Sequence, residues 1–256
     1  MSTQARTRSR EIRRAQARLV AERRAGRIRL IAAGGGVVIL ALVVAIVVSV
    51  VGAARSTDAP TSTETSGPLV VPANATAGGA IAIGQATAPV RLEVYLDYMC
   101  PYCGRFERAN SAEIERLVVA GTARLELYPL SFLDRFSAGT RYSTRAANAV
   151  ATVADRAPQA VLAFNRALFE AQPEEGSPGR SDDEIAALAL AAGVPQGVVD
   201  AFDERMFEPW LTASTAAVFQ TGITGTPTVK INGVVFTGDL FTVGPLTQAI
   251  ETAAGR

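Results

Sequence analysis

Two cysteines lie close together in the segment YLDYMCPYCGRF, which spans residues 95–106. Cys100 and Cys103 are separated by two residues, and the chain of 256 residues has no other cysteine. A pair at this spacing can close a small disulfide ring and exchange it with thiols on another molecule. Thiol–disulfide exchange is therefore the first chemistry that the sequence predicts.

The rest of the composition limits the alternatives. The chain has no histidine, which excludes Ser-His and Cys-His catalysis and removes a common zinc ligand. A single Cys-x-x-Cys motif lacks the further ligands that a zinc or copper site needs. An inert structural disulfide is another alternative, but so short a loop adds little stability through chain entropy. We expect no metal and no cofactor.

The flanking residues place the pair at the beginning of a helix. Residues 89–97 alternate in the manner of a strand that leads directly into Cys100. Pro101 suits the first turn of a helix, which we expect to end at Gly121. The free N–H groups of that helix end would stabilise a thiolate at Cys100, which makes it the expected nucleophile. Cys103, one turn further on, is the expected resolving partner.

The remaining elements predict a sheet that is interrupted by helices. Further strands are expected at 81–84, 123–130, 227–231 and 234–238, and further helices at 139–155, 158–172, 181–192, 195–220 and 243–254. Ser181 and Glu184 form a predicted capping box, and Asn232-Gly233 predicts a type I′ hairpin. The parallel strand-helix-strand unit, the helical insert at about 137–220 and the final hairpin and helix predict an α/β, thioredoxin-like fold with a helical insertion over residues 80–256.

Two segments resemble the DsbA-like, thioredoxin-fold disulfide oxidoreductases. They are APVRLEVYLDYMCPYCGRF at 88–106 and TGITGTPTVKING at 221–233, and the resemblance covers roughly residues 80–254. It implies that the Thr226–Pro227 bond is cis, that Pro227 packs against the two cysteines, and that Thr226 offers backbone groups to an extended substrate. Pro101 and Tyr102, between the cysteines, are further candidates for substrate contact.

The chain departs from this family at two places. Many relatives carry a buried acid six residues before the first cysteine, where this chain has Val94. Proton transfer is then left to water, to Asp97, or to Glu93, which we expect on the opposite side of the strand as a paired surface carboxylate. The Pro101-Tyr102 dipeptide also lacks the histidine of strongly oxidising relatives, which predicts a milder oxidant.

An apolar segment near the N-terminus predicts a membrane anchor. Residues 30–51, LIAAGGGVVILALVVAIVVSVV, carry no charge and would span about 33 Å as a helix. Residues 1–29 contain ten arginines and two glutamates, a balance of +8, whereas residues 52–256 have a balance of −7. The positive-inside rule therefore predicts a cytoplasmic basic tail that contacts anionic lipid, and an extracytoplasmic remainder. A cleaved signal peptide is the competing interpretation.

Two other features of the N-terminal region shape the expected organisation. The basic tail has no interleaved aromatic residues, so we do not expect it to bind nucleic acid. Residues 52–79 are rich in Ser, Thr, Ala, Pro and Gly and predict a flexible linker.

The sequence thus predicts a membrane-anchored, single-pass thiol–disulfide oxidoreductase of the cell membrane. Its expected substrates are reduced or misoxidised exported proteins, and the family resemblance implies a quinone-linked membrane oxidase as redox partner. A reductase or isomerase of the same fold, and a chaperone that binds clients without turnover, are the alternatives.

Overall fold

The computed structural model describes residues 69–255. The predicted basic tail at 1–29, the predicted transmembrane helix at 30–51 and residues 52–68 of the predicted linker lie outside this range. Within residues 69–255, none of the helices is both long and apolar enough to cross a bilayer.

The described residues form one five-stranded sheet. Its strands are β1 (Ile81–Ile83), β2 (Val90–Leu96), β3 (Ala123–Pro129), β4 (Thr228–Ile231) and β5 (Val234–Val235), in the order β1-β3-β2-β4-β5. The central strands β2 and β3 run parallel, as the predicted strand-helix-strand unit requires, and the other neighbours are antiparallel. Asn232 and Gly233 both have positive φ, 51° and 85°, which confirms the type I′ turn between β4 and β5. Strand β5 is shorter than the predicted 234–238.

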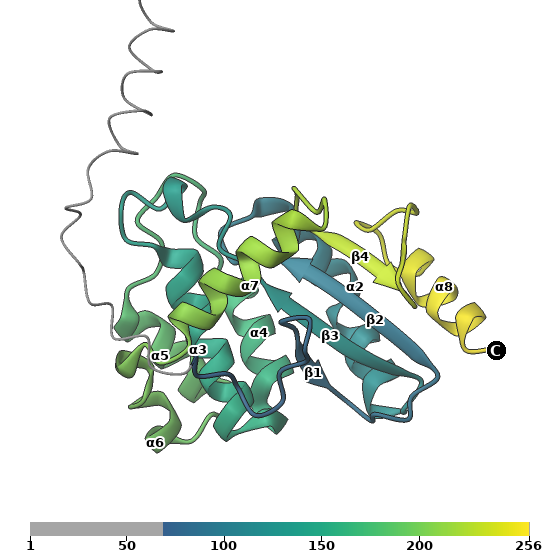
Figure 1. Cartoon of the computed structure of the whole chain (residues 1–256), viewed down its shortest axis with the longest axis horizontal. Coiled ribbons are helices and arrows are strands. Elements are labelled where there is room, and N and C mark those ends of the chain that lie inside the picture. Colours follow the sequence, from purple (N-terminus) through teal and green to yellow (C-terminus); the bar gives the residue numbers. More distant parts are fainter. Residues whose placement is uncertain (1–68, 256) are drawn as a thin grey trace, which may run out of the picture. The chain divides into compact units, whose positions relative to one another are not determined.

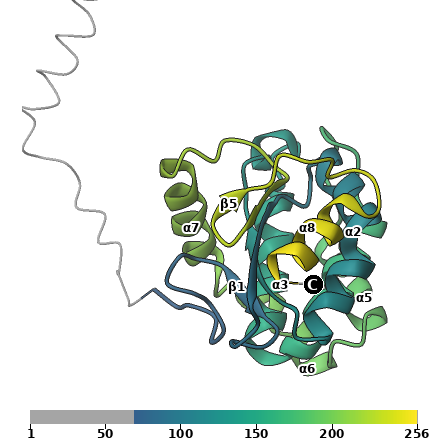
Figure 2. The same cartoon turned by 90° about the vertical axis from the view of Figure 1, so that its right-hand side faces the viewer.

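Helix α2 (Pro101–Val119) connects the two parallel strands. Together with the C-terminal helix α8 (Pro245–Ala253) it lies on one side of the sheet, and α7 (Glu208–Gln220) lies on the other (Figures 1 and 2). Cys100 is the N-cap residue of α2, so the polypeptide changes from strand to helix at the site of the predicted chemistry.

The predicted helical insert separates β3 from β4. It contains α3 (Tyr142–Arg156), α4 (Val161–Glu170), α5 (Asp182–Ala191), α6 (Gln196–Val199) and α7, with short 3-10 turns between some of them. The capping box of α5 is formed as expected, since the Ser181 side chain accepts from the Glu184 N–H and the Glu184 carboxylate accepts from the Ser181 N–H. The thioredoxin-like fold with a helical insertion is therefore present.

The prediction of a single helix over 195–220 is wrong. The chain instead forms α6, a 3-10 turn at Phe202–Glu204, and then α7. Arg205 adopts a left-handed conformation with φ 51°, which ends the 3-10 turn. Pro209 lies in the first turn of α7, where its missing N–H is tolerated, whereas in the interior of a longer helix it would remove a hydrogen bond.

Residues 69–79, which the sequence assigned to the flexible linker, have defined contacts with the folded domain. The Ala73 N–H donates to the Asp155 carboxylate at 2.8 Å, the Ala82 N–H donates to the Asn74 carbonyl at 3.0 Å, and Ala75 forms an antiparallel bridge with Ile81. The ordered domain therefore begins before residue 80. The small and polar composition of this segment gave no indication of its order, because hydrogen bonds and a strand-like bridge to the folded domain hold it.

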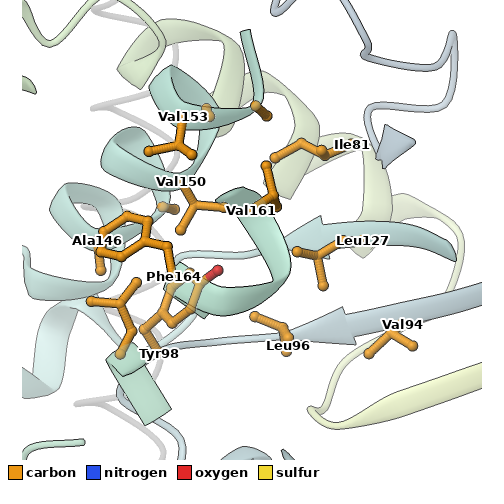
Figure 3. Close-up of a cluster of buried hydrophobic side chains, with 14 of the residues drawn as sticks. Ile81, Val94, Leu96, Tyr98, Leu127, Ala146, Val150, Val153, Val161 and Phe164 are labelled. Carbon is orange, nitrogen blue, oxygen red and sulfur yellow. The ribbon is translucent and has the colours of Figure 1, made fainter. Parts of the chain in front are cut away.

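A continuous hydrophobic core joins the sheet to the insert. Side chains of the strands, such as Val94, Leu96 and Leu127, lie near side chains of α3 and α4, such as Val150 and Phe164 (Figure 3). Burial of this apolar surface fixes the insert against the end of β2, next to Cys100.

Candidate active site

Cys100 lies where β2 gives way to α2. Its backbone is extended, with φ −73° and ψ 116°, and its N–H donates to the Asp97 carbonyl at 3.0 Å. The Cys103 N–H donates to the Cys100 carbonyl at 3.0 Å, which closes the first turn of α2. Cys100 is 6% exposed and Cys103 0%, and both are free thiols in this structure. An incoming sulfur can therefore reach Cys100 first.

The surroundings of Cys100 favour its thiolate. The pKa of Cys100 is lowered to about 6, and the largest cause is a hydrogen bond from the Cys103 thiol. The Thr226 side chain and the N–H groups of Cys103 and Tyr102 lower the pKa further, whereas burial of Cys100 opposes them. The helix end that the sequence predicted is present, and the hydrogen bond from the partner thiol is the largest single contribution to the lowered pKa.

Cys103 has the opposite character. Burial raises its pKa well above the usual value, and the neighbouring Cys100 raises it further. At neutral pH the reduced site therefore holds a thiolate at Cys100 and a thiol at Cys103. This is the asymmetry that a nucleophile and a resolving partner require.

The second signature segment packs against the cysteines. The Thr226–Pro227 peptide bond is cis, as the resemblance implied. The Cys100 Sγ lies 3.3 Å from the Thr226 carbonyl oxygen, to which it donates in its thiol form, so residues 126 positions apart in the sequence meet at the reactive sulfur. The segment continues directly into β4, whose pairing with β2 holds it beside α2.

The two residues between the cysteines face outward. Pro101 is exposed, and Tyr102 is 56% exposed. The Tyr102 ring lies 6.1 Å from the Phe241 ring, and the Arg105 guanidinium lies 4.6 Å from the centre of Phe241. These side chains form an aromatic and cationic surface beside the reactive sulfur.

Asp97 is buried directly before the cysteine pair. Its carboxylate accepts hydrogen bonds from the Met99 N–H at 2.9 Å, the Leu133 N–H at 2.9 Å and the Ser143 hydroxyl at 2.6 Å. Burial raises the pKa of Asp97 to about 7 in spite of these bonds. Asp97 therefore ties the active-site loop both to the segment after β3 and to helix α3 of the insert.

Glu93, the other carboxylate that the sequence singled out, is not a surface residue. It is 5% exposed, forms an ion pair with Arg91 at 3.0 Å, and accepts a hydrogen bond from the Tyr95 hydroxyl at 2.9 Å. The prediction of a paired carboxylate was correct, but its placement on the surface was wrong. Because side chains alternate along β2, Glu93 and Val94 lie on opposite faces of the sheet, and Val94 is on the side of α2.

Gln172 is a residue of the site that the sequence reasoning missed. It lies just after α4, and its Nε2 donates to the carbonyls of Tyr98 at 3.1 Å and Cys100 at 2.9 Å. A Cβ atom added to Gly104 would lie 2.1 Å from the Gln172 Oε1, so the glycine makes room for this contact. Gly104 inside a helix was the available sequence signal.

Comparisons with known proteins agree with this geometry. A family model described as "Thioredoxin" matches residues 76–251. The reduced form of the disulfide bond oxidoreductase DsbG from Mycobacterium tuberculosis is 25% identical, with a TM-score of 0.57, over 71% of this chain and 95% of that one. The thiol-disulfide oxidoreductase MdbA from Actinomyces oris is 26% identical, with a TM-score of 0.60, over 73% of this chain and 89% of that one.

A curated relative is similar over a shorter region. The serine/threonine-protein kinase PknE from Mycobacterium tuberculosis is 34% identical over 115 residues, which is 43% of this chain and 20% of the kinase. The matching part of the chain thus spans about a fifth of the length of the curated relatives that it matches. The family match, the two structural neighbours and the paired cysteines at the N-terminus of α2 agree. The chain therefore belongs to the thioredoxin family, as a homologue of the DsbA-like thiol-disulfide oxidoreductases.

Proposed function

We propose that the chain is a membrane-anchored, extracytoplasmic dithiol oxidase that introduces disulfides into exported proteins. The observation that carries this proposal is the difference between the two sulfurs. Cys100 can be approached and has a pKa lowered to about 6, whereas Cys103 is fully buried and its pKa is raised.

The proposed cycle begins with the Cys100–Cys103 disulfide. A substrate thiolate attacks the Cys100 Sγ, the disulfide breaks, and Cys103 leaves with the electron pair as a thiolate that takes up a proton. A second substrate thiolate then attacks the substrate sulfur of the mixed disulfide, and Cys100 leaves as a thiolate. The substrate loses two electrons and gains a disulfide, and both cysteines of the chain are reduced.

The stability of the leaving thiolate supports the oxidising direction. A thiol with a low pKa leaves more readily, and stabilising the thiolate stabilises the reduced form of the pair. Hydrogen bonding to Cys100 therefore makes the disulfide more oxidising. A pKa of about 6 is less extreme than that of the strongest oxidants, about 3.5, which supports a moderate oxidant.

Substrate binding would use the surface around Cys100. The carbonyl of Thr226 faces the reactive sulfur, and backbone groups of an extended peptide could pair with this segment whatever the peptide's sequence. The exposed Tyr102 ring, with Pro101 beside it, offers apolar contact to an unfolded client. This combination suits a broad range of exported proteins.

The membrane part of the proposal rests on the sequence. The uncharged segment at 30–51 and the arginines before it support a single-pass anchor with the cysteines outside the cytoplasm. Reduced Cys100 and Cys103 must then pass their electrons on, for which we propose a quinone-linked oxidase in the same membrane. A membrane-impermeant maleimide applied to intact cells should label Cys100 of the reduced chain, and protection of Cys100 until the cells are lysed would contradict this location.

Disulfide transfer tests the activity itself. The oxidised full-length chain in detergent is mixed with a reduced peptide that contains two cysteines, and the loss of peptide thiols is followed. We expect one peptide disulfide per chain, and no transfer by Cys100→Ser. Peptide binding without transfer would indicate a chaperone. Failure to oxidise the peptide, together with reduction of a peptide disulfide by the reduced chain, would indicate a reductase and contradict the proposed direction.

A further inference from the structure

Two long stretches of the described chain carry no charged side chain. Residues 69–90 and 209–229 contain no Asp, Glu, Lys or Arg, although 19% of the whole sequence is charged and about four charges would be expected in each stretch. Burial accounts for part of this, since both stretches contribute residues to the core. It does not account for their exposed positions, where charged side chains are normally most frequent.

The exposed positions of both stretches lie on the same side of the domain. The outer side of α7 is formed by Thr212, Ala213, Ala216, Ala217, Phe219 and Gln220. The N-terminal segment packs closely against this helix, since a Cβ atom added to Gly79 would lie 2.7 Å from the Ser214 Oγ. Figure 2 shows α7 and the first described residues on the same side of the sheet. We call these side chains of α7, together with the exposed parts of residues 69–79, the α7 face.

The α7 face is hollowed and apolar at its centre. A hollow of about 320 Å³ lies between the N-terminal segment and α7, and its lining includes Leu69, Val71, Trp210 and Ala217. Leu69, Val70 and Val71 are 49%, 46% and 46% exposed. Three consecutive apolar side chains that remain half in water favour contact with another apolar surface.

The charged groups that border the α7 face are already paired. Glu208, at the start of α7, forms an ion pair with Arg141 at 3.0 Å. Asp155 accepts a hydrogen bond from the Ala73 N–H at 2.8 Å and lies 4.0 Å from Arg156. These pairs leave the border of the face close to neutral. A surface that covers the face therefore has to bind through apolar contact rather than through charge.

The position of the face along the chain indicates what covers it. The proposed anchor ends at residue 51 and the face begins at Leu69, so 17 residues lie between them. A flexible linker of that length has an end-to-end distance of about 20–25 Å and gives its two ends a high effective concentration for each other. The bilayer is thus an apolar surface within constant reach of the face, and weak contacts are enough to hold it there.

We propose that the α7 face docks on the bilayer to which the chain is anchored, with residues 69–71 at the boundary between headgroups and acyl chains. This inference rests on the membrane anchor of the proposed function. Docking would fix the orientation of the active site, because α7 ends at Gln220 and the chain continues to the Thr226–Pro227 bond beside Cys100. The reactive sulfur would then stay at a constant distance from the membrane.

The single tryptophan of the chain can report this contact. Trp210 is 4% exposed and lines the hollow, and the sequence has no other tryptophan. The full-length chain is reconstituted into phosphatidylcholine vesicles, and its fluorescence is compared with that in the same lipid brominated in the upper acyl chains, because bromine quenches tryptophan at short range. An interfacial face is buried by about 5–10 Å, so we expect the brominated lipid to quench roughly half of the fluorescence or more.

Val71→Asp is the decisive variant because it places a charge in the lining of the hollow. A carboxylate is costly to move into the acyl region, so quenching should fall by roughly twofold or more. Val119→Asp makes the same change at another exposed valine, at the end of α2 on the other side of the sheet, and should leave quenching unchanged. Both variants should still transfer their disulfide to the reduced peptide, which shows that they are folded.

Salt distinguishes apolar docking from attraction between charges. Since the α7 face carries no charge, quenching should be the same at low salt and at about 1 M salt, where the screening length falls to about 3 Å. It should also not increase when phosphatidylglycerol replaces part of the phosphatidylcholine. Quenching that is lost at high salt would mean that charged side chains elsewhere make the contact, and would overturn the inference.

The other outcomes separate this inference from the proposed function. A chain that floats with the vesicles but whose Trp210 is not quenched, or is quenched equally in Val71→Asp, would overturn the docking and leave the anchor and the redox activity intact. Quenching that falls as the protein-to-lipid ratio rises would assign the face to a second copy of the chain and would also overturn it. A chain that does not float with the vesicles would contradict the proposed anchor itself, and the docking with it.

Discussion

Replacing Cys103 tests where the acidity of Cys100 comes from. Cys103→Ala removes the thiol whose hydrogen bond contributes most to lowering the Cys100 pKa to about 6. A hydrogen bond to a charged group is worth about 1.5–3 kcal/mol, and one pKa unit corresponds to about 1.36 kcal/mol. We therefore expect the Cys100 pKa to rise by about one to two units. It should not return to the ordinary value of 9.0, because the Thr226 side chain and the N–H groups of Tyr102 and residue 103 remain.

Cys103→Ser is the matched control for this experiment. Its hydroxyl can donate to the Cys100 thiolate in place of the thiol, so the pKa should stay close to the wild-type value. The chain has two cysteines, so either variant leaves Cys100 as the single thiol to titrate. The rate of alkylation by iodoacetamide as a function of pH gives its pKa. Equal pKa values for Cys103→Ala and Cys103→Ser would refute the role of the partner thiol and leave the helix end as the main cause.

Three further changes have outcomes that the structure determines. Gln172→Glu would place a carboxylate against the carbonyls of Tyr98 and Cys100, so the Cys100 pKa measured by alkylation should rise by about one unit, equivalent to about 1–2 kcal/mol, whereas an unchanged pKa would rule out this contact. The Cys100 pKa is depressed from 9.0 to about 6 in the folded chain, so ionisation of Cys100 stabilises the reduced fold. This stabilisation is complete above pH 9.0 and is lost as pH falls through 6. Urea unfolding should therefore show reduced wild type gaining about 1 kcal/mol over Cys100→Ser between pH 5 and pH 7, and a difference that does not vary with pH would contradict this. Ser181→Ala removes the cap of α5 and should lower the free energy of unfolding by about 1 kcal/mol, with no effect on the alkylation rate of Cys100.

The local features of the site could be predicted from the sequence because short motifs determine them. The strand before Cys100 and the proline after it place the pair at a helix N-terminus. The Asn232-Gly233 pair fixes the hairpin, since both residues must adopt positive φ. The capping box of α5 depends on two residues three positions apart. Each of these signals acts within a few residues of the structure that it specifies.

The remaining features of the site depend on contacts between distant segments. Gln172 reaches Cys100 across 72 positions, and Ser143 reaches Asp97 across 46, so neither contact has a local pattern. The helical insert, whose role the sequence left open, thus reaches the active site through polar side chains.

The reduction potential of the Cys100–Cys103 pair tests the proposed oxidase most directly. Equilibrating the full-length chain with mixtures of reduced and oxidised glutathione and counting its free thiols gives this potential. Known pairs range from about −120 mV for a strong oxidant to about −270 mV for a reductant. With Cys100 held largely as a thiolate at neutral pH, we expect a value near about −180 mV. A value at or below about −270 mV would mean that the pair donates electrons to its substrates, which contradicts an oxidase.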